Sequence, residues 1–98
     1  MNVAQLQVTT TLMNRRIIMD KRFIEFAQEK IAERLGCNKE EVYVVWLSKT
    51  LQNIKGLFSS NVPEAKGLYY EATYNGDKKE LYLDTYQKQS NEHLDIEL

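Results

Sequence analysis

Residue types that build cross-links and active sites are scarce in this chain of 98 residues. It has one cysteine, Cys37, and one histidine, His93, so an internal disulfide and a Cys/His metal site are excluded. His93 lies in the polar tail with no cysteine nearby in the sequence, so we expect no nucleophile–base pair. No apolar run is long enough to span a bilayer, and the first residues lack the layout of a signal peptide. We therefore expect a cytoplasmic, non-enzymatic protein that carries no metal and no cofactor.

An excess of either charge is also missing. The 13 basic and 14 acidic residues leave a net charge of −1, whereas proteins dedicated to nucleic-acid binding concentrate basic charge. The chain is 43% hydrophobic and contains one proline, which is typical of an ordered globular domain. The length predicts a single domain.

The first 18 residues have no strong periodicity, and two interpretations remain open. Val8–Leu12 has strand propensity and could add a short strand to a sheet. Alternatively, Arg15, Arg16 and the spacing to Met19 match what a purine-rich ribosome-binding sequence followed by a start codon would encode. Residues 1–18 would then be a translated leader or a weakly ordered extension, and we expect Met1–Arg15 to pack poorly.

A helix is predicted over Asp20–Leu35. Asp20 is a favourable N-cap residue, and Gly36 can adopt the left-handed conformation that ends a helix. Asn38 and Glu41 then have the spacing of a capping box, which predicts one further helical turn. Apolar residues recur at helical spacing and predict one face packed on a sheet. This stripe consists of Phe23, Ile24, Ala27, Ile31 and Leu35, with Phe26 widening it.

Alternation of aromatic or β-branched residues with polar ones predicts four strands. They cover Val42–Leu51, Lys55–Asn61, Leu68–Tyr74 and Lys79–Thr85. The expected fold class is α+β, with one N-terminal helix packed on a four-stranded, mainly antiparallel sheet in the order α-β-β-β-β. Residues 19–86 form this domain. Residues 87–98 are a polar, acidic tail that either frays or forms a short helical turn.

The last two predicted strands are joined at Asn75-Gly76, the strongest hairpin signal in the chain. A two-residue loop would place Glu71 opposite Glu80, two like charges side by side. Cross-strand repulsion favours a four-residue loop that begins at Asn75 and sets Thr73 opposite Glu80.

The first predicted strand is apolar on both faces. Val42, Val44 and Trp46 are expected to point toward the helix, while the opposite face must be covered by one of the terminal segments or by another subunit. The expected core is Phe23, Ala27, Ile31, Leu35, Val44, Trp46, Leu57, Tyr70, Leu81 and Leu83.

Two groups of side chains are candidates for interaction. Tyrosines on the outer face of the last two strands suit contact with a protein, and neighbouring lysines make single-stranded nucleic acid the alternative. The polar string from residue 49 to residue 55 either clamps an anion or a backbone, or is a hairpin bend whose amides bond locally. The candidates are Tyr69, Tyr82 and Tyr86 in the first group and Lys49, Gln52, Asn53 and Lys55 in the second.

Four sequence blocks occur in a fixed order: Val42–Trp46, Lys49–Asn53, Leu68–Glu71 and Thr73–Glu80. They closely resemble a family of small uncharacterised proteins, a domain of unknown function, from phages and prophages of Gram-positive bacteria. The resemblance extends over about residues 19–86. It supplies no activity and no catalytic residue, and it implies an accessory protein that acts inside the bacterial host.

The expected function is therefore binding without catalysis. The partner would be a protein, either a second copy in a homodimer or a host or phage factor, and inhibition of a host factor would fit the implied context. The alternative is a protein that binds single-stranded nucleic acid through lysines and tyrosines of the sheet and loops.

Overall fold

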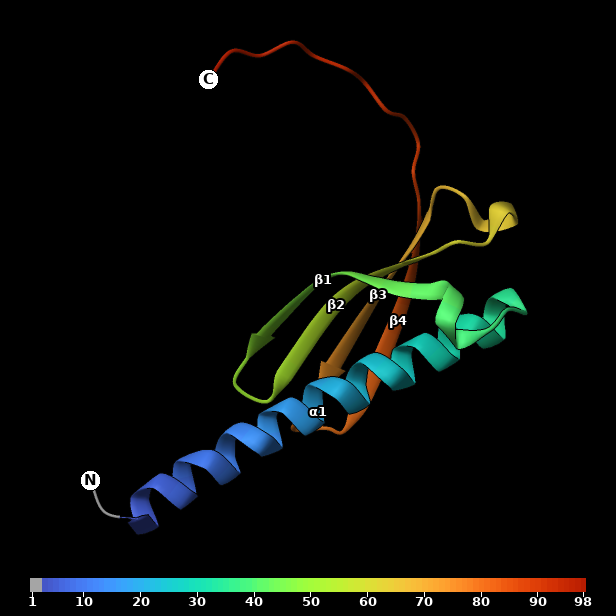
Figure 1. The fold of residues 1–98 in the computed structure, drawn as a ribbon. Coiled ribbons are helices and arrows are strands. Elements are labelled where there is room, and N and C mark those ends of the chain that lie inside the picture. The colour runs from blue at the N-terminus through green and yellow to red at the C-terminus, as the bar shows by residue number, and fades with distance from the viewer. Residues whose placement is uncertain (1–2) are drawn as a thin grey trace.

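The structure, a computed structural model, describes the backbone of residues 3–98 and the side chains from residue 19 onward. One helix precedes a four-stranded antiparallel sheet, which confirms the predicted α+β fold class (Figure 1). The elements are α1 (Val3–Leu35), the 3₁₀ turn η1 (Lys39–Glu41), β1 (Val42–Thr50), β2 (Asn53–Ser60), the 3₁₀ turn η2 (Pro63–Ala65), β3 (Leu68–Asn75) and β4 (Glu80–Gln87).

Helix α1 begins well before the predicted start. Its backbone is helical from Val3, so the strand that was one of the two interpretations of this segment, at Val8–Leu12, is wrong. Asp20 lies inside the helix and is not its N-cap; its Oδ2 instead lies 3.0 Å from Lys49 Nζ on β1. The first half of α1 extends beyond the sheet (Figure 1). The expected poor packing of Met1–Arg15 concerns side chains outside the described residues.

The carboxyl end of α1 confirms the predicted stop. Gly36 has a φ of +66°, and the Cys37 amide donates to the Ala32 carbonyl at 3.1 Å, the hydrogen bond of a Schellman motif. The Asn38 amide then donates to Glu41 Oε2 at 2.9 Å, the return half of a capping box. These bonds define the reversal that places β1 back along the helix.

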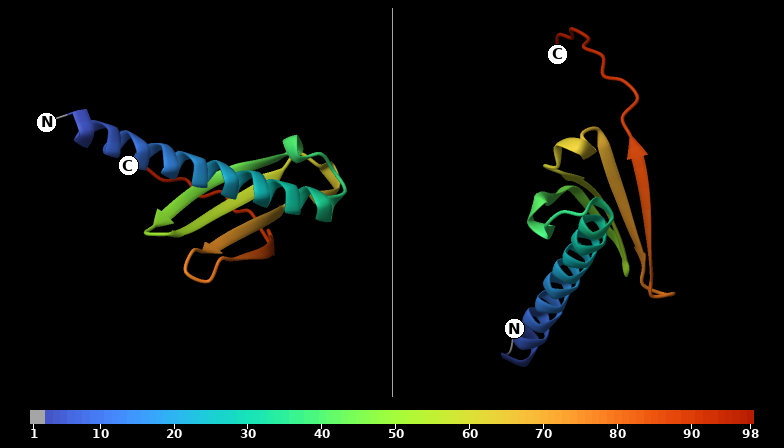
Figure 2. Two further views of the ribbon diagram at one scale, coloured as in Figure 1. Left: turned by 90° about the horizontal axis from the view of Figure 1, so that it is seen from below. Right: turned by 90° about the vertical axis from the view of Figure 1, so that its right-hand side faces the viewer.

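The four strands lie in the spatial order β1-β2-β3-β4, with antiparallel neighbours throughout. Helix α1 lies across one side of the sheet (Figure 2). We call this side the inner face and the opposite side the outer face. Because the order is sequential, β1 and β4 form the two edges of the sheet.

The core lies between α1 and the inner face. Phe23 and Phe58 meet at its centre, with ring centroids 6.2 Å apart and planes inclined by 54°. Of the expected core residues, those that are buried or packed against the core are Phe23, Ala27, Ile31, Leu35, Val44, Tyr70, Leu81 and Leu83. Val42, expected to point toward the helix, is buried as well, and the further buried residues of this core are Ala32, Ile54, Phe58 and Ala72.

Two of the predicted core positions, Trp46 and Leu57, are wrong, and a β-bulge in β1 is the reason for Trp46. The register shifts between Val44 and Trp46, so Val45 is an extra residue without a partner on β2. Beyond the bulge, alternation resumes in the opposite phase, which sends Leu47 to the inner face and leaves Trp46 40% exposed on the outer face. Leu57, the partner of Trp46, also lies on the outer face.

The β3–β4 register differs from the predicted one by two residues. The loop has four residues, as expected, but Asn75 pairs with Glu80 and Glu71 lies opposite Asp84. Asn75 stabilises this loop, because its Oδ1 accepts from the amides of the second and third residues after it at 3.1 and 3.2 Å. The repulsion between Glu71 and Asp84 is offset by Lys55, whose Nζ lies 3.3 Å from Glu71 Oε1.

The C-terminal segment leaves the sheet at one corner. Strand β4 runs through Gln87, and the Lys88 amide donates to the Gly67 carbonyl at 2.7 Å. Residues 89–98 then have no regular secondary structure, so the helical turn considered for this segment is absent. Within the part of the chain that the structure describes, no helix has the length and apolar content needed to cross a membrane.

Candidate functional site

The outer face of the sheet gathers aromatic side chains from three strands. Directly paired Tyr69 and Tyr86 link β3 to β4, and Tyr82 follows on β4. The bulge adds Trp46 from β1, and Tyr43 lies on the same face. We define the aromatic face as Tyr43, Trp46, Leu57, Tyr69, Tyr82 and Tyr86.

Most of the aromatic face is open to solvent. The exposed fractions are 45% for Tyr43, 40% for Trp46, 51% for Tyr82 and 50% for Tyr86. Helix α1 covers the opposite side of the sheet (Figure 2). The sequence therefore correctly indicated a strand that is apolar on both faces. Of the described residues, none forms a layer on the second face.

Carboxylates on the outer face lie next to one ion pair and one tyrosine hydroxyl. Lys55 on β2 forms the ion pair with Glu71 on β3, and Asp84 lies beside Glu71 on β4. The Tyr82 hydroxyl donates to Glu80 Oε2, and this hydrogen bond to a carboxylate is the main reason why the Tyr82 pKa is raised above its ordinary value. The face thus combines aromatic rings with carboxylates.

The second group of candidate residues separates into different places. Lys55 lies on the outer face, as above, whereas Lys49 lies on the inner face beside Asp20 of α1. The two candidate groups therefore do not form one continuous site. Lys49 contributes to the attachment of β1 to the helix.

Gln52 and Asn53 join the two hairpin turns at one end of the sheet. Asn53 Oδ1 accepts from the Gly76 amide at 3.2 Å, and Gln52 Nε2 donates to Asp77 Oδ1. A Cβ at Gly76 would lie only 2.4 Å from the Gln52 carbonyl oxygen, so the approach of the turns requires glycine. These amides contact the neighbouring turn, and do not bond only within their own bend.

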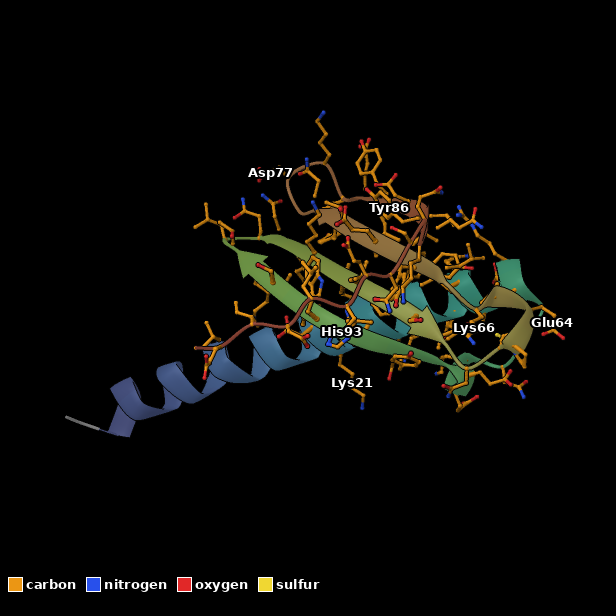
Figure 3. All side chains as sticks on the ribbon, turned by 90° about the horizontal axis from the view of Figure 1, so that it is seen from above. Lys21, Glu64, Lys66, Asp77, Tyr86 and His93 are labelled. Carbon is orange, nitrogen blue, oxygen red and sulfur yellow. The ribbon has the colours of Figure 1, made fainter. Side chains whose placement is uncertain are left out.

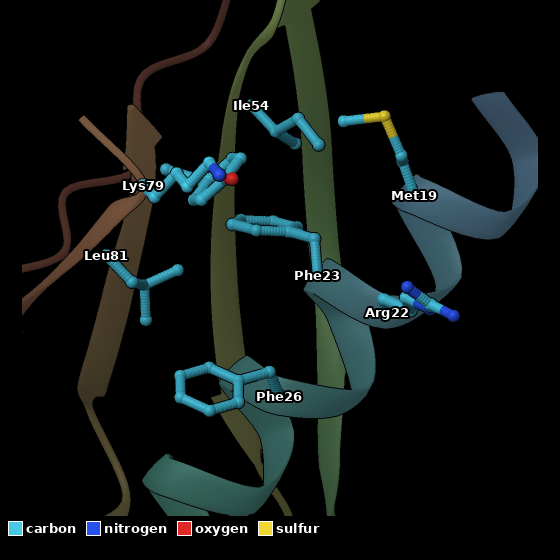
Figure 4. Close-up of a pocket in the computed structure, with 8 residues that line it drawn as sticks. Met19, Arg22, Phe23, Phe26, Ile54, Lys79 and Leu81 are labelled. Carbon is cyan, nitrogen blue, oxygen red and sulfur yellow. The ribbon is translucent and has the colours of Figure 1, made fainter. Parts of the chain in front are cut away.

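A shallow apolar hollow of about 440 Å³ lies on the inner side, between α1 and the β3–β4 end of the sheet (Figure 4). Phe26, which the helical stripe placed at the margin of the buried face, is 47% exposed in its wall, with Lys30 Nζ 5.4 Å from its ring centroid. The lining residues are Met19, Arg22, Phe23, Phe26, Ile54, Tyr74, Lys79 and Leu81.

Groups with catalytic potential are dispersed over the described residues. Tyr70 is buried in the core, Lys49 lies beside the helix and Asn53 lies at the turn, so these three do not share a hollow. Burial, followed by the nearby Glu41 carboxylate, raises the pKa of the Cys37 thiol. Residues 19–98 contain no group of three His, Cys, Asp or Glu side chains placed to hold a metal ion.

The fold and surface define a small α+β domain with one sheet face packed on a helix and the other face open and aromatic. The chain belongs to a family of unknown function, DUF6275, whose model matches residues 16–96. The match includes more than half of α1, the entire sheet and most of the C-terminal segment. No curated protein and no solved structure matches the chain.

Proposed function

We propose that this protein is a small non-enzymatic binding module that contacts another protein through its aromatic face. The observation that carries the proposal is the open outer surface on which Tyr43, Trp46, Tyr82 and Tyr86 are each at least 40% exposed. Aromatic side chains are enriched at protein interfaces because their rings offer a large contact area with few rotatable bonds. Exposing such a surface to water does not stabilise the fold, and exposed apolar patches often mark sites of interaction.

The distribution of polar groups favours a protein partner over a nucleic acid. Glu71 and Asp84 lie side by side on β3 and β4, on the same face as the tyrosines, and would repel phosphates. Lys55 is held in an ion pair with Glu71, which reduces its availability to an incoming anion. A protein surface can meet the same mixture of rings and charges with apolar contacts at the centre and hydrogen bonds at the rim.

The resemblance of the sequence blocks to proteins of phages and prophages supports a setting for this binding. In this proposal the protein is a phage or prophage accessory factor in the cytoplasm of a bacterial host. Its partner is a host or phage protein or a second copy of itself. Inhibition of a host factor by occlusion fits a module that offers a surface and no catalytic group.

Quantitative affinity capture from bacterial cells that carry the protein tests the proposal. We expect Tyr82→Ala combined with Tyr86→Ala to reduce recovery of any specific partner at least about tenfold, as for interface anchors. Phe26→Ala is the matched control, since Phe26 is an aromatic residue of similar exposure on the inner side. Equal capture by both variants, or loss only with Phe26→Ala, would refute the choice of face.

One contact favours single-stranded nucleic acid as the second candidate. Lys88 Nζ lies 6.0 Å from the centroid of the Tyr69 ring, an arrangement of cation and ring that is also suited to a stacked base and its phosphate. A gel shift with single-stranded DNA and RNA at increasing salt separates the candidates. Binding that weakens steeply with salt and is lost in Tyr69→Ala would replace the protein-binding proposal.

A further inference from the structure

The C-terminal segment has the side-chain pattern of a strand. Leu94, Ile96 and Leu98 alternate with Asp95 and Glu97, the period of two that is typical of a strand with one apolar face. The three apolar side chains are 72%, 77% and 109% exposed. The segment continues past the end of β4 and leaves the body of the domain (Figures 1 and 2). A strand of this kind becomes stable only when it pairs with a sheet edge.

The free edge of β1 is an available acceptor. Among the strands of residues 3–98, β1 pairs only with β2, so the backbone groups along its other side have no strand partner there. Natural edges are usually protected by charges or proline, but β1 contains only one charged residue, Lys49, and no proline. Its residues from Val42 to Leu47 are all apolar, and the bulge at Val45 is the one irregularity in its pairing with β2.

Charge selects β1 over the other free edge. Strand β4 carries Glu80 and Asp84, and these would lie beside the acidic residues Asp95 and Glu97 if the segment paired there. The β1 edge instead has no acidic residue, and its one charged side chain, Lys49, lies on the inner side in the ion pair with Asp20 of α1. Lys21 projects from α1 on the same side of the molecule (Figure 3).

The direction of the chain favours pairing of the segment with β1 of a second copy over pairing with β1 of the same chain. The segment starts at the end of the sheet where β1 begins, so along its own β1 it can run only parallel. Antiparallel pairing would require it first to travel the length of β1, roughly 30 Å for nine residues, and then to return. The five residues 89–93 that precede Leu94 span at most roughly 18 Å and cannot carry the segment past β1 before it returns, whereas the β1 edge of another molecule imposes no such limit.

We propose that residues 94–98 add as an antiparallel strand to the β1 edge of a second copy, and that reciprocal exchange closes a dimer. In the favoured register, Leu94 and Ile96 lie on the outer side beside Trp46, and Asp95 and Glu97 lie on the inner side near the two lysines. Backbone hydrogen bonds supply affinity, and alternate side chains set the register, as in other cases of strand addition. The inference concerns the edge of the sheet and does not depend on the partner proposed for the aromatic face.

Light scattering and sedimentation of the full chain over a range of concentrations test the proposal. We expect wild type to dimerise, and Leu94→Ser combined with Ile96→Ser to raise the dissociation constant at least about tenfold. Gln89→Ser combined with Asn91→Ser is the control in the same segment and should leave the dimer unchanged. Hydrogen exchange should show β1 amides protected in the wild-type dimer and faster in the Leu94/Ile96 variant, with β2 and β3 protection equal in both.

Reversal of two charges provides a second test of the dimer. Glu97→Lys should weaken the dimer, and Lys21→Glu in the same chain should restore it, because the two sites meet across the interface. A monomeric wild type at all concentrations, or a dimer that survives the Leu94/Ile96 variant, would overturn the proposal. A monomer whose β1 protection depends on Ile96 would show pairing within one chain and overturn it equally.

The same assay with Tyr82→Ala separates the two proposals. Because Tyr82 lies on β4, away from the β1 edge, its substitution should leave the dimer intact even where it abolishes capture of another partner. Loss of the dimer in Tyr82→Ala would show that the copies meet through the aromatic face and not through strand exchange.

Discussion

The turn between β1 and β2 contains a leucine in an unfavourable conformation, and replacing it should stabilise the protein. Leu51 has a φ of +57° and is 91% exposed. A left-handed conformation costs an ordinary L-residue roughly 1–2 kcal/mol, whereas asparagine adopts it more readily. Because the leucine side chain buries almost nothing, its removal forfeits little transfer free energy.

We expect Leu51→Asn to raise the free energy of unfolding by about 1 kcal/mol, which corresponds to an increase in Tm of roughly 4–8 °C for a domain of this size. Leu51→Gly should gain less, because glycine also increases the entropy of the unfolded chain by the equivalent of about 0.4–1 kcal/mol. Urea denaturation followed by circular dichroism measures both, with an unchanged m-value showing that the unfolded state is comparable.

Thr50→Asn is the matched control, since Thr50 is the last residue of β1 and loses strand propensity on substitution. The predicted order of stability is Leu51→Asn, then wild type, then Thr50→Asn. If Leu51→Asn were as stable as wild type or less stable, the left-handed turn would not be the conformation of this hairpin in solution.

Three further substitutions test other parts of the structure. Phe58→Ala removes a fully buried ring and should lower the free energy of unfolding by about 3–5 kcal/mol in urea denaturation, leaving little native protein. Gly76→Ala places a Cβ against the Gln52 carbonyl oxygen, so it should lower the free energy of unfolding by about 1–3 kcal/mol and speed hydrogen exchange of the residue 76 amide. Unchanged exchange would show that the two turns do not contact each other. The raised pKa of the Cys37 thiol predicts slow alkylation at neutral pH that accelerates only under more alkaline conditions, and Glu41→Gln should shift this profile to lower pH; an unshifted profile would remove Glu41 as a cause.

Local sequence signals predicted the order of the elements because their physical causes are local. The stripe from Phe23 to Leu35, the glycine at 36 and the alternation in the strands each depend on a few neighbouring residues. The element order and the sheet are therefore correct, and strand ends differ from the predicted ones by only a few residues.

The bulge in β1 and the β3–β4 register depend on pairing between strands, so the local sequence could not predict them. Nothing local to β1 shows that Val45 is an extra residue, because the bulge is a property of its pairing with β2. This single residue transfers Trp46 from the expected core to the open face, where it becomes part of the candidate site. The predicted β3–β4 register is wrong for a related reason, since the repulsion at Glu71 is relieved by Lys55 on β2, the strand that pairs with the other side of β3.

The alternation in the C-terminal segment was available in the sequence and was missed. Residues 87–98 are mostly polar and acidic, but Leu94, Ile96 and Leu98 form a short apolar series with a period of two. Only the structure shows that these side chains stay uncovered at the end of a domain with a free apolar edge. The alternation therefore indicates a pairing strand only when it is considered together with the free edge of β1.

The most direct test of the open aromatic face is radical footprinting of the full-length protein with and without its captured partner. We predict that Trp46, Tyr82 and Tyr86 lose reactivity in the complex, while Phe26, on the inner side, keeps its reactivity. Protection of Phe26 with Trp46, Tyr82 and Tyr86 still fully reactive would contradict the assignment and place the binding surface at the hollow beside α1.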